Sequence, residues 1–560
     1  MKTRVFLRIF GTLLKLMGVL LLVPGAVAAF YREPTGVVAF FLTSIATLLA
    51  ALACERLGVA EEMGTKEGLA LVAFGWLGAA FFGALPYVFC GMGLVDALFE
   101  SMSGFTTTGA SILTESNAQG YWIINQTLAD VSLASYLAQA ADRSLTAAEG
   151  MLLNSTLLQS IHNATVGTPG LPIAGGGAIG LNATLGLAGR MALPEEPTYF
   201  GLLFWRSFSQ WLGGMGIILL FIAILPKLGV AGRQLYKAEV PGPDKDALTP
   251  RIRQTAELLW WIYLLLSTAQ VVLLVGAGMP LYDALCNMFA AMATGGFSPQ
   301  AASIAAYKSA LIDGIIVLFM FLAGANFALH YKTLYEDRTA LIKDAEFRFY
   351  ALIILLSTAL IMIWGGLSGG ILERFRYAIF QVVSVITTTG FFTADFDQWT
   401  PAARFVLILL MFVGACAGST GGAIKVVRLL MVIKYGHREL LRALHPKIVS
   451  TVKLGSTPVR DDVLYPSIIF FALYILIFAV ATLLLGAVSA GDPGMSMEAL
   501  ISAVATTLGN VGPGLGQVGP TLSFSEVHPA GKMLLFLCMW IGRLEIITPL
   551  VLLLPEFWKK

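Results

Sequence analysis

The sequence predicts an all-α integral membrane protein with two N-terminal helices followed by four repeats of helix, re-entrant segment and helix. Three observations lead to this fold class: the composition, ten apolar stretches of spanning length, and four short apolar pieces that end alike. Hydrophobic residues make up 57% of the 560 residues and charged residues only 12%. Soluble globular chains carry ~25% charged residues, so this chain has too few charges to cover a surface in water.

The same composition excludes several classes of function. A formal net charge of +2 is too small to indicate a nucleic-acid partner. The five cysteines are odd in number, scattered and without a CxxC pair, so they indicate neither a zinc site nor a disulfide framework. An intramembrane enzyme, such as a lipid-linked glycosyltransferase, would need Asp, Glu or His side chains gathered at a membrane face, and the sequence shows no such group. We therefore do not expect an enzyme.

The apolar stretches give the topology, because ~20 apolar residues suffice to cross a bilayer as a helix. The first, Val5–Phe30, resembles a secretory signal, but Lys15 interrupts it and its length suits a retained transmembrane helix. An even number of spans places both termini on one side. The ten stretches lie near residues 5–30, 37–54, 68–92, 199–226, 254–279, 308–330, 349–367, 402–433, 463–488 and 531–554.

The distribution of Lys and Arg predicts which side that is. Basic residues are frequent at both termini and in the loops near 227–253, 332–348 and 434–460, which share the side of the termini, and they are sparse in the opposite loops. Cytoplasmic loops carry the excess of Lys and Arg. The termini are therefore predicted to be cytoplasmic.

Four pieces too short to span lie between the longer stretches, all on the outer side. They cover residues 96–109, 283–295, 376–390 and 498–512, and each ends in a cluster of small residues: Thr107–Ala110, Ala293–Gly296, Thr388–Phe391 and Asn510–Pro513. We expect a leader (1–66) and four repeats (67–252, 253–345, 346–461, 462–560). The stretch 116–196 in the first repeat is predicted to be an outer-face insertion of unknown role.

Four such segments around one axis can bind a cation. Non-helical backbone at membrane depth must be buried or line a cavity, and carbonyl oxygens there can replace the water around an ion. Glycine adopts the φ values that such a loop needs, and the preceding helices direct their partly negative ends inward. The clusters contain no Asp or Glu, so they suit a weakly hydrated monovalent cation. Tight helix packing by small residues is the alternative, but four clusters in register favour the ion site.

The candidate ligands are the backbone and hydroxyl oxygens of these clusters. The candidate ion-binding residues are Thr107, Thr108, Gly109, Thr294, Gly295, Thr388, Thr389, Gly390, Asn510, Val511 and Gly512.

Two features of the later spans predict a gate. The stretch 402–433 contains Ala417–Gly422, and glycine disfavours a helix by ~1 kcal/mol, so we expect this span to unwind or kink. Arg543 lies deep in the last span, where a charge must face a partner such as Glu545, a carbonyl or water. Lys425 is predicted to reach the cytoplasmic interface. The candidate gate residues are Gly418, Ser419, Thr420, Gly421, Gly422 and Arg543.

Five segments of the sequence closely resemble the TrkH-type potassium uptake proteins of the Trk/Ktr/HKT superfamily. They are Ser103–Gly109, Gln210–Gly216, Gly414–Gly422, Leu508–Gly514 and Gly542–Glu545. The resemblance covers nearly the whole chain outside 116–196.

The resemblance implies K⁺ uptake across the cytoplasmic (inner) membrane through one pseudo-fourfold pore per chain. It also implies a homodimer and a cytoplasmic nucleotide-binding regulatory partner of the TrkA type. The filter glycines of the family would fall on Gly109, Gly295, Gly390 and Gly512. Serine at the first of these accompanies Na⁺ transport in plant relatives, so Gly109 favours K⁺. A Na⁺-selective or Na⁺/K⁺-coupled carrier is the alternative. Residues 417–422 would then be an obstructing loop, and Arg543 an electrostatic barrier.

Overall fold

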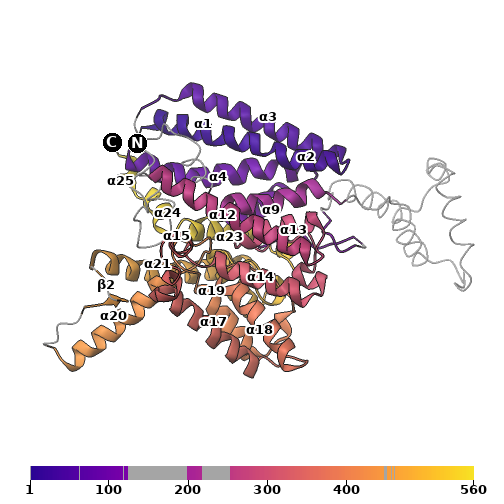
Figure 1. Cartoon of the computed structure of the whole chain (residues 1–560). Helices are drawn as coiled ribbons and strands as arrows, with labels where there is room; N and C mark the ends of the chain where they lie inside the picture. Colours follow the sequence, from indigo (N-terminus) through magenta and orange to yellow (C-terminus); the bar gives the residue numbers. More distant parts are fainter. Residues whose placement is uncertain are drawn as a thin grey trace, which may run out of the picture.

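The computed structural model describes residues 2–61, 63–117, 119–123, 198–216, 252–446, 451–455, 457–459, 461–492 and 494–559. These residues form helices almost throughout (Figure 1). The one sheet in these ranges is an antiparallel pair of two-residue strands, β1 (Lys453–Leu454) and β2 (Thr457–Pro458). The predicted all-α fold class is confirmed.

The N-terminal leader consists of α1 (Thr3–Leu20), α2 (Leu22–Phe30) and α3 (Pro34–Leu57). Leu21 keeps helical dihedral angles, so α1 and α2 form one apolar span of 28 residues. A carboxylate joins this leader to the first repeat: Glu33 accepts hydrogen bonds from the backbone N–H groups of Phe200 (2.5 Å) and Gly201 (3.1 Å). Burial raises the pKa of Glu33 to about 7.

Four repeats follow, each with a long helix, a short helix and a second span, and the described residues show an interrupted second span in repeats 2, 3 and 4. Repeat 1 has α4 (Thr65–Phe89), α5 (Leu94–Phe105) and α9 (Phe200–Gly214); repeat 2 has α12 (Ile252–Gly276), α13 (Leu281–Met292), α14 (Ala310–Ala323) and α15 (Phe327–Tyr335). Repeat 3 has α17 (Ala345–Trp364), α18 (Ile371–Ile386), α19 (Pro401–Phe412) and α20 (Val426–Leu444); repeat 4 has α21 (Asp461–Val488), α22 (Met497–Gly509), α23 (Pro529–Arg543) and α24 (Ile547–Leu552). The chain also forms the short helices α16 (Ala340–Lys343) and α25 (Pro555–Trp558).

The second spans of repeats 2, 3 and 4 are not continuous helices in the described residues. In the described ranges six helices are long and apolar enough to cross a membrane, and α14 with α15 forms a seventh crossing bent by 98°. The bend lies at Gly324–Asn326. Likewise α19 and α20 are separated by residues 413–425, and α23 and α24 by residues 544–546. The physical reason is the small residues at mid-span, which let neighbouring backbone approach and interrupt the helix.

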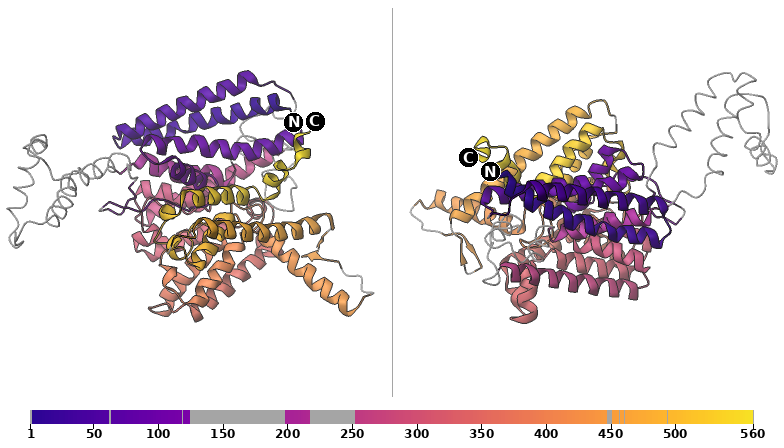
Figure 2. Two further views of the ribbon diagram at one scale, coloured as in Figure 1. Left: turned by 180° about the vertical axis from the view of Figure 1, so that it is seen from behind. Right: turned by 90° about the horizontal axis from the view of Figure 1, so that it is seen from above.

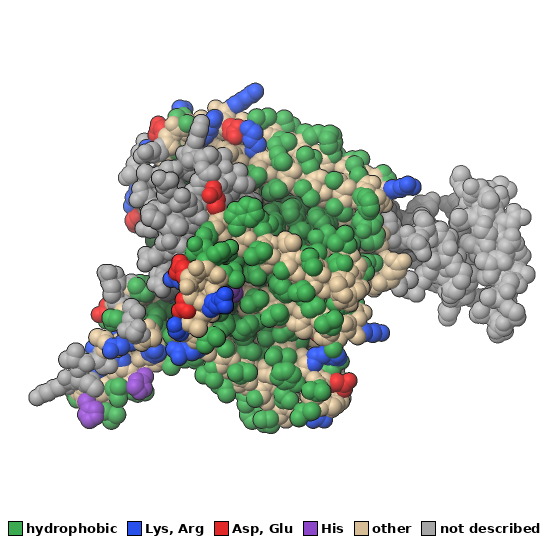
Figure 3. Space-filling model, viewed as in Figure 1, with side chains coloured by type: hydrophobic (Ala, Val, Ile, Leu, Met, Phe, Trp, Pro, Cys, Tyr) green, Lys and Arg blue, Asp and Glu red, His purple; other side chains and the backbone are tan. Residues whose placement is uncertain are grey.

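The surface has the character of a protein in lipid. Large apolar side chains such as Phe30 (80% exposed) and Leu483 (73% exposed) point outward. The face in Figure 3 is hydrophobic across its middle, with charged side chains toward its margins. The two termini lie side by side in every view (Figures 1 and 2).

Most of the stretch 116–196 lies outside the described residues, but its beginning is anchored to repeat 2. The N–H of Trp122 donates to the carbonyl of Pro299 (3.1 Å), and the N–H of Ala301 donates to the carbonyl of Gly120 (2.8 Å). The Tyr121 hydroxyl donates to the Asp283 carboxylate (3.1 Å). Residues up to 123 therefore belong to the folded body.

Candidate ion pore

The four short helices α5, α13, α18 and α22 each lead into a loop with the same backbone. One residue in each loop adopts the left-handed conformation: Thr107 (φ 52°), Thr294 (φ 53°), Thr388 (φ 58°) and Asn510 (φ 54°). Two residues further, a glycine also has positive φ: Gly109 (81°), Gly296 (76°), Gly390 (82°) and Gly512 (113°). A left-handed Thr is strained, and a left-handed residue recurs at four equivalent places, as Thr in three of them and Asn in the fourth, which indicates a functional backbone geometry. We name the loops that follow α5, α13, α18 and α22 pore loops 1, 2, 3 and 4.

The second pore loop is registered one residue later than the sequence predicted. Gly296, not Gly295, has the positive φ and stands two residues after the left-handed threonine. Gly295 corresponds instead to Thr108, Thr389 and Val511. The two glycines are adjacent, and spacing alone does not say which of them needs the unusual φ.

The pore loops form a closed ring in sequence order. A Cβ atom added to Gly109 would lie 2.1 Å from the carbonyl oxygen of Gly295 in pore loop 2. The same contact recurs between Gly296 and the carbonyl of Thr389 (1.9 Å), and between Gly390 and that of Val511 (2.1 Å). Gly512 closes the ring, because a Cβ there would lie 2.7 Å from the carbonyl oxygen of Thr108. Each glycine thus allows the next loop's backbone to approach, which defines a pseudo-fourfold arrangement.

A small cavity opens on one side of this ring. Its volume is about 60 Å³, and all four positive-φ glycines line it, together with Ser111 and Ser298 among others. The pore loops supply neutral oxygen atoms, and the described part of the chain contains no cluster of three His, Cys, Asp or Glu side chains that could hold a metal ion. Carbonyl and hydroxyl oxygens without fixed charge are suited to a weakly hydrated cation.

The other side of the ring is in contact with the interrupted span of repeat 3. The Thr294 hydroxyl donates to the Thr420 hydroxyl (3.2 Å), and the N–H of Gly422 donates to the Thr388 hydroxyl (2.7 Å). Asn510 is tied within the ring by its amide, which donates to the Thr108 hydroxyl (2.9 Å). The candidate gate residues therefore lie directly against the left-handed residues of pore loops 2 and 3.

Residues 413–425 interrupt the helix as expected. We name them the intramembrane loop. The break needs glycine at position 418, because this residue has φ 69° and a Cβ there would lie 2.8 Å from the Asn326 side-chain oxygen. The loop also bonds to the break in repeat 2, since the N–H of Cys416 donates to the carbonyl of Gly324 (3.0 Å).

Lys425 corrects one prediction from the sequence. Its side chain does not reach the interface; the residue is 2% exposed, and its ammonium group donates to the carbonyl of Gly421. A buried ammonium requires such a partner. The lysine thus folds back onto the intramembrane loop.

Glu346, at the start of α17, is a site residue that sequence reasoning missed. Its carboxylate accepts the backbone N–H of Ala417 (2.7 Å) and of Val427 (3.1 Å). One side chain therefore holds the intramembrane loop and the first turn of α20. The sequence signal was a carboxylate next to an apolar span, but its partners lie 71 and 81 residues away.

Arg543 ends α23 beneath pore loop 1. Its guanidinium donates to the Thr107 hydroxyl (3.0 Å) and to the carbonyls of Thr420 (2.9 Å), Gly213 (2.6 Å) and Gly214 (3.1 Å). The expected carbonyl partners are present. Glu545, the other expected partner, forms an ion pair with Arg428 (2.6 Å). A positive charge beside the ring of pore loops can act on a cation that leaves it.

A ring of four pore loops between membrane helices, contacted on one side by a broken span, defines a cation-transporting membrane protein rather than an enzyme. A family model described as "TrkH: Cation transport protein" matches residues 191–560. The chain belongs to this TrkH family of cation transport proteins.

Individual relatives extend the similarity to the whole chain. The Trk system potassium uptake protein TrkH of Vibrio parahaemolyticus is 35% identical over 571 residues, and TrkH of Escherichia coli K12 is 35% identical over 573 residues, each covering 100% of both chains. TrkG of Escherichia coli K12 is 29% identical over 569 residues and covers 99% of both chains. The crystal structure of the potassium transporter TrkH from Vibrio parahaemolyticus matches with a TM-score of 0.75 at 32% identity, covering 100% of both chains.

Proposed function

We propose that this protein takes up K⁺ across the cytoplasmic membrane, with the ring of pore loops as its selectivity filter. The observation that carries the proposal is the ring itself, in which each positive-φ glycine lies against a carbonyl of the next loop. Such closely placed carbonyls replace the hydration shell of a cation. The relatives named as potassium uptake proteins support K⁺ as the ion.

The intramembrane loop and Arg543 form the gate in this proposal. Thr420 and Gly422 contact pore loops 2 and 3 from one side, so an ion leaving the filter meets the intramembrane loop. Arg543 adds a positive charge at the same level and also binds the carbonyl of Thr420. Opening then requires a displacement of residues 413–425 together with α20.

A cytoplasmic partner of the TrkA type supplies that displacement in our proposal. Helix α20 begins at Val426, immediately after the intramembrane loop, and ends away from the bundle (Figure 1). A nucleotide-dependent movement of a partner bound there would reach the loop directly. The relatives are named as proteins of a Trk system. We further propose a homodimer in the inner membrane with both termini cytoplasmic.

Ion flux into proteoliposomes tests the function. The purified chain should accumulate ⁸⁶Rb⁺ along a K⁺ gradient, and unlabelled K⁺ should compete more strongly than Na⁺. Equal competition by Na⁺, or Na⁺-dependent accumulation, would instead identify a Na⁺-selective or Na⁺/K⁺-coupled carrier. Absence of cation flux with and without a TrkA-type partner, for protein shown to be folded and inserted, would reject the proposal.

A further inference from the structure

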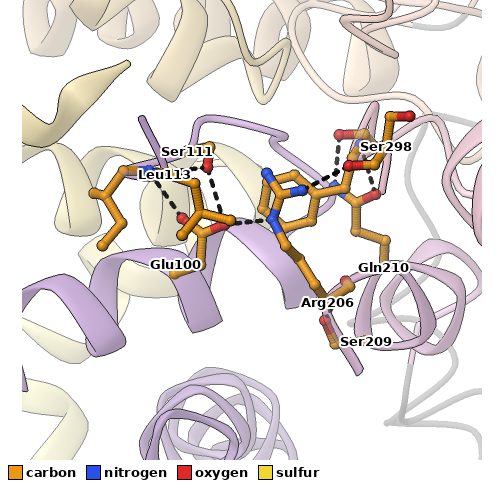
Figure 4. Close-up of polar contacts among 10 residues, drawn as sticks. Glu100, Ser111, Leu113, Arg206, Ser209, Gln210 and Ser298 are labelled. Atoms are coloured by element: carbon orange, nitrogen blue, oxygen red, sulfur yellow. Dashed lines mark hydrogen bonds and ion pairs between the residues drawn. The ribbon is translucent and has the colours of Figure 1, made fainter. Parts of the chain in front are cut away.

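A buried ion pair lies behind pore loops 1 and 2. Glu100 on α5 is 0% exposed and Arg206 on α9 is 3% exposed, and Arg206 Nε lies 2.5 Å from Glu100 Oε1 (Figure 4). A buried ion pair is weak evidence for stability, because desolvation offsets the attraction between the charges. The role of this ion pair is therefore inferred from the other contacts of its two side chains.

Each member of the pair holds a different pore loop just past its glycine. Glu100 accepts the Ser111 hydroxyl (3.1 Å) and the backbone N–H of Ile112 (3.0 Å) in pore loop 1. Arg206 donates through Nη1 to the carbonyl of Ser298 (3.0 Å) in pore loop 2. Its guanidinium also lies 3.7 Å from the centre of the Phe297 ring. Arg206 binds Glu100 with Nε and the Ser298 carbonyl with Nη1, and Glu100 in turn binds pore loop 1. The pair thereby fixes the two neighbouring loops with respect to each other.

Gln210, one turn further along α9, strengthens the hold on pore loop 2. Its amide nitrogen donates to the carbonyl of Gly295 (2.6 Å), and its amide oxygen accepts the N–H of Phe297 (3.1 Å). Helix α9 thus supports pore loop 2 on both sides of Gly296, while α5 supports pore loop 1.

The other pore helices have no such charge at the equivalent place. Seven residues before each left-handed residue stand Glu100, Asn287, Gln381 and Ala503, each 0% exposed. Gln381 reaches the Thr393 hydroxyl at 3.5 Å, a weak contact. Asn287 donates to the Tyr307 hydroxyl (2.9 Å) instead of to its own pore loop. The ring is therefore supported unequally, because of these four equivalent residues only Glu100 carries a charge.

Arg206 also lines the cavity that the four positive-φ glycines share. A positive charge there would repel an arriving cation, and Glu100 offsets it at 2.5 Å. In this geometry the ion pair has two separate effects. It fixes the spacing of two pore loops, and it keeps the cation path electrically neutral.

We propose that Glu100 and Arg206 are positioning residues of the filter, which set its selectivity through Arg206 and keep K⁺ access open through Glu100. This inference deepens the proposed K⁺ function and rests on it. Two charge-specific variants separate the two effects. Arg206→Lys keeps the charge, but an ammonium group lacks the planar fork that reaches Glu100 and Ser298 together. Glu100→Gln keeps the shape but leaves Arg206 uncompensated.

The test measures ⁸⁶Rb⁺ influx and K⁺/Na⁺ competition in proteoliposomes at low and high ionic strength, for equal amounts of inserted protein. We expect Arg206→Lys to lower the K⁺/Na⁺ preference about tenfold, which corresponds to ~1.4 kcal/mol. Glu100→Gln should lower influx, more strongly at low salt, because salt screens the exposed charge. The double variant Glu100→Gln with Arg206→Gln should regain influx but not selectivity. Arg404→Lys, in the part-exposed ion pair of Arg404 with Glu498 (3.0 Å) away from the ring glycines, is the matched control and should resemble the wild type.

Each outcome decides one part. Wild-type selectivity in inserted Arg206→Lys protein would overturn the positioning role, and wild-type influx and salt dependence in Glu100→Gln would overturn the neutralising role. If Glu100→Gln fails to insert, the double variant decides the second part: influx below that of Arg206→Lys counts against it. Absence of K⁺ flux in the wild type would reject the proposed function itself, which is a different result.

Discussion

The guanidinium of Arg543 donates to the hydroxyl of Thr107 at 3.0 Å, although the two residues are 436 positions apart. Thr107 is the left-handed residue of pore loop 1, and Arg543 also binds the carbonyl of Thr420 in the intramembrane loop. One charged side chain thus connects the proposed filter to the proposed gate. This relationship makes Arg543 a direct place to test the proposed mechanism.

Arg543→Ala should raise K⁺ influx while leaving the K⁺/Na⁺ preference nearly intact. Two unit charges about 6 Å apart repel by ~3 kcal/mol at an effective dielectric constant of ~20, which is about a hundredfold in ion occupancy. Arg543→Lys, which keeps the charge, is the control and should remain close to the wild type in ⁸⁶Rb⁺ influx. Lower influx in inserted Arg543→Ala protein would show that the arginine is structural.

Shortening the intramembrane loop tests the same gate from the other side. Deleting part of Ala417–Gly422 should raise influx and weaken its dependence on a TrkA-type partner, because this segment contacts pore loops 2 and 3. The measurement is influx with and without the partner and its nucleotide. Full dependence on the partner after the deletion would place the gate elsewhere.

Glu346→Gln should also favour the open state. The carboxylate accepts two backbone N–H groups, at Ala417 and Val427, and hydrogen bonds to a charged group contribute ~1.5–3 kcal/mol each. Partner-independent influx should therefore increase. Asp344→Asn removes a charge two residues away, and Asn caps a helix as well as Asp does, so this variant is the matched control. Equal basal influx in the two variants would contradict the role of Glu346.

The register of pore loop 2 can be tested with serine substitutions. Gly109→Ser, Gly296→Ser and Gly390→Ser should each lower the K⁺/Na⁺ preference about tenfold or more, since a strained φ costs roughly 1–3 kcal/mol and a Cβ would meet a carbonyl within 2.1 Å. Gly295→Ser should disturb selectivity less, because Gly295 has no positive φ and its Cβ would meet the Gln210 side chain and not the backbone of the next loop. Gly436→Ser on α20, with nothing within 4 Å, controls for the substitution itself. A greater loss for Gly295→Ser than for Gly296→Ser would restore the register predicted from the sequence.

Glu33 predicts a pH dependence of stability. Burial raises its pKa from 4.5 to about 7 in the folded protein, so the folded state binds more protons than the unfolded state between these values. The contribution of Glu33 to stability is therefore full below pH 4.5 and declines as the pH rises to about 7. In thermal unfolding of the detergent-solubilised protein, Glu33→Gln should flatten this decline relative to the wild type. Parallel pH profiles for the two proteins would refute the assignment.

The fold was predictable because its signals are local. Apolar runs of spanning length and four Thr/Gly clusters in parallel define the leader and the repeats without knowledge of any contact. The register at Gly295 and Gly296 was not predictable, because two adjacent glycines satisfy the same spacing. Burial of Lys425 was also missed, since its carbonyl partner appears only when the intramembrane loop turns back.

The supports behind the pore loops were harder to predict. Glu100 and Arg206 pair across 106 residues, and Glu346 holds a loop more than 70 residues away. A usable signal existed, because a charge inside an apolar helix must find a partner. Sequence spacing did not identify that partner, which depends on how the helices pack.

An excision of the outer stretch must spare the residues that contact repeat 2. Removing residues 118–194 would delete Tyr121 and Trp122, which bind Asp283 and Pro299 of repeat 2. Removing residues 124–197 and joining 123 to 198 with a short Gly/Ser linker should preserve insertion and influx, because Asn117 and Thr198 already meet at 2.6 Å. Loss of inserted protein with the shorter excision would show that the removed residues pack into the body.

The four quarters of the ring belong to one polypeptide, and this has a consequence for how its selectivity can change. In a pore made of four identical subunits, a single codon change alters every quarter at once. Here the residues at the equivalent supporting place, Glu100, Asn287, Gln381 and Ala503, can vary independently. Exchanging them one at a time would change one quarter of the ring while the other three keep their residues. Ion discrimination could thus change in steps, each through a separate codon.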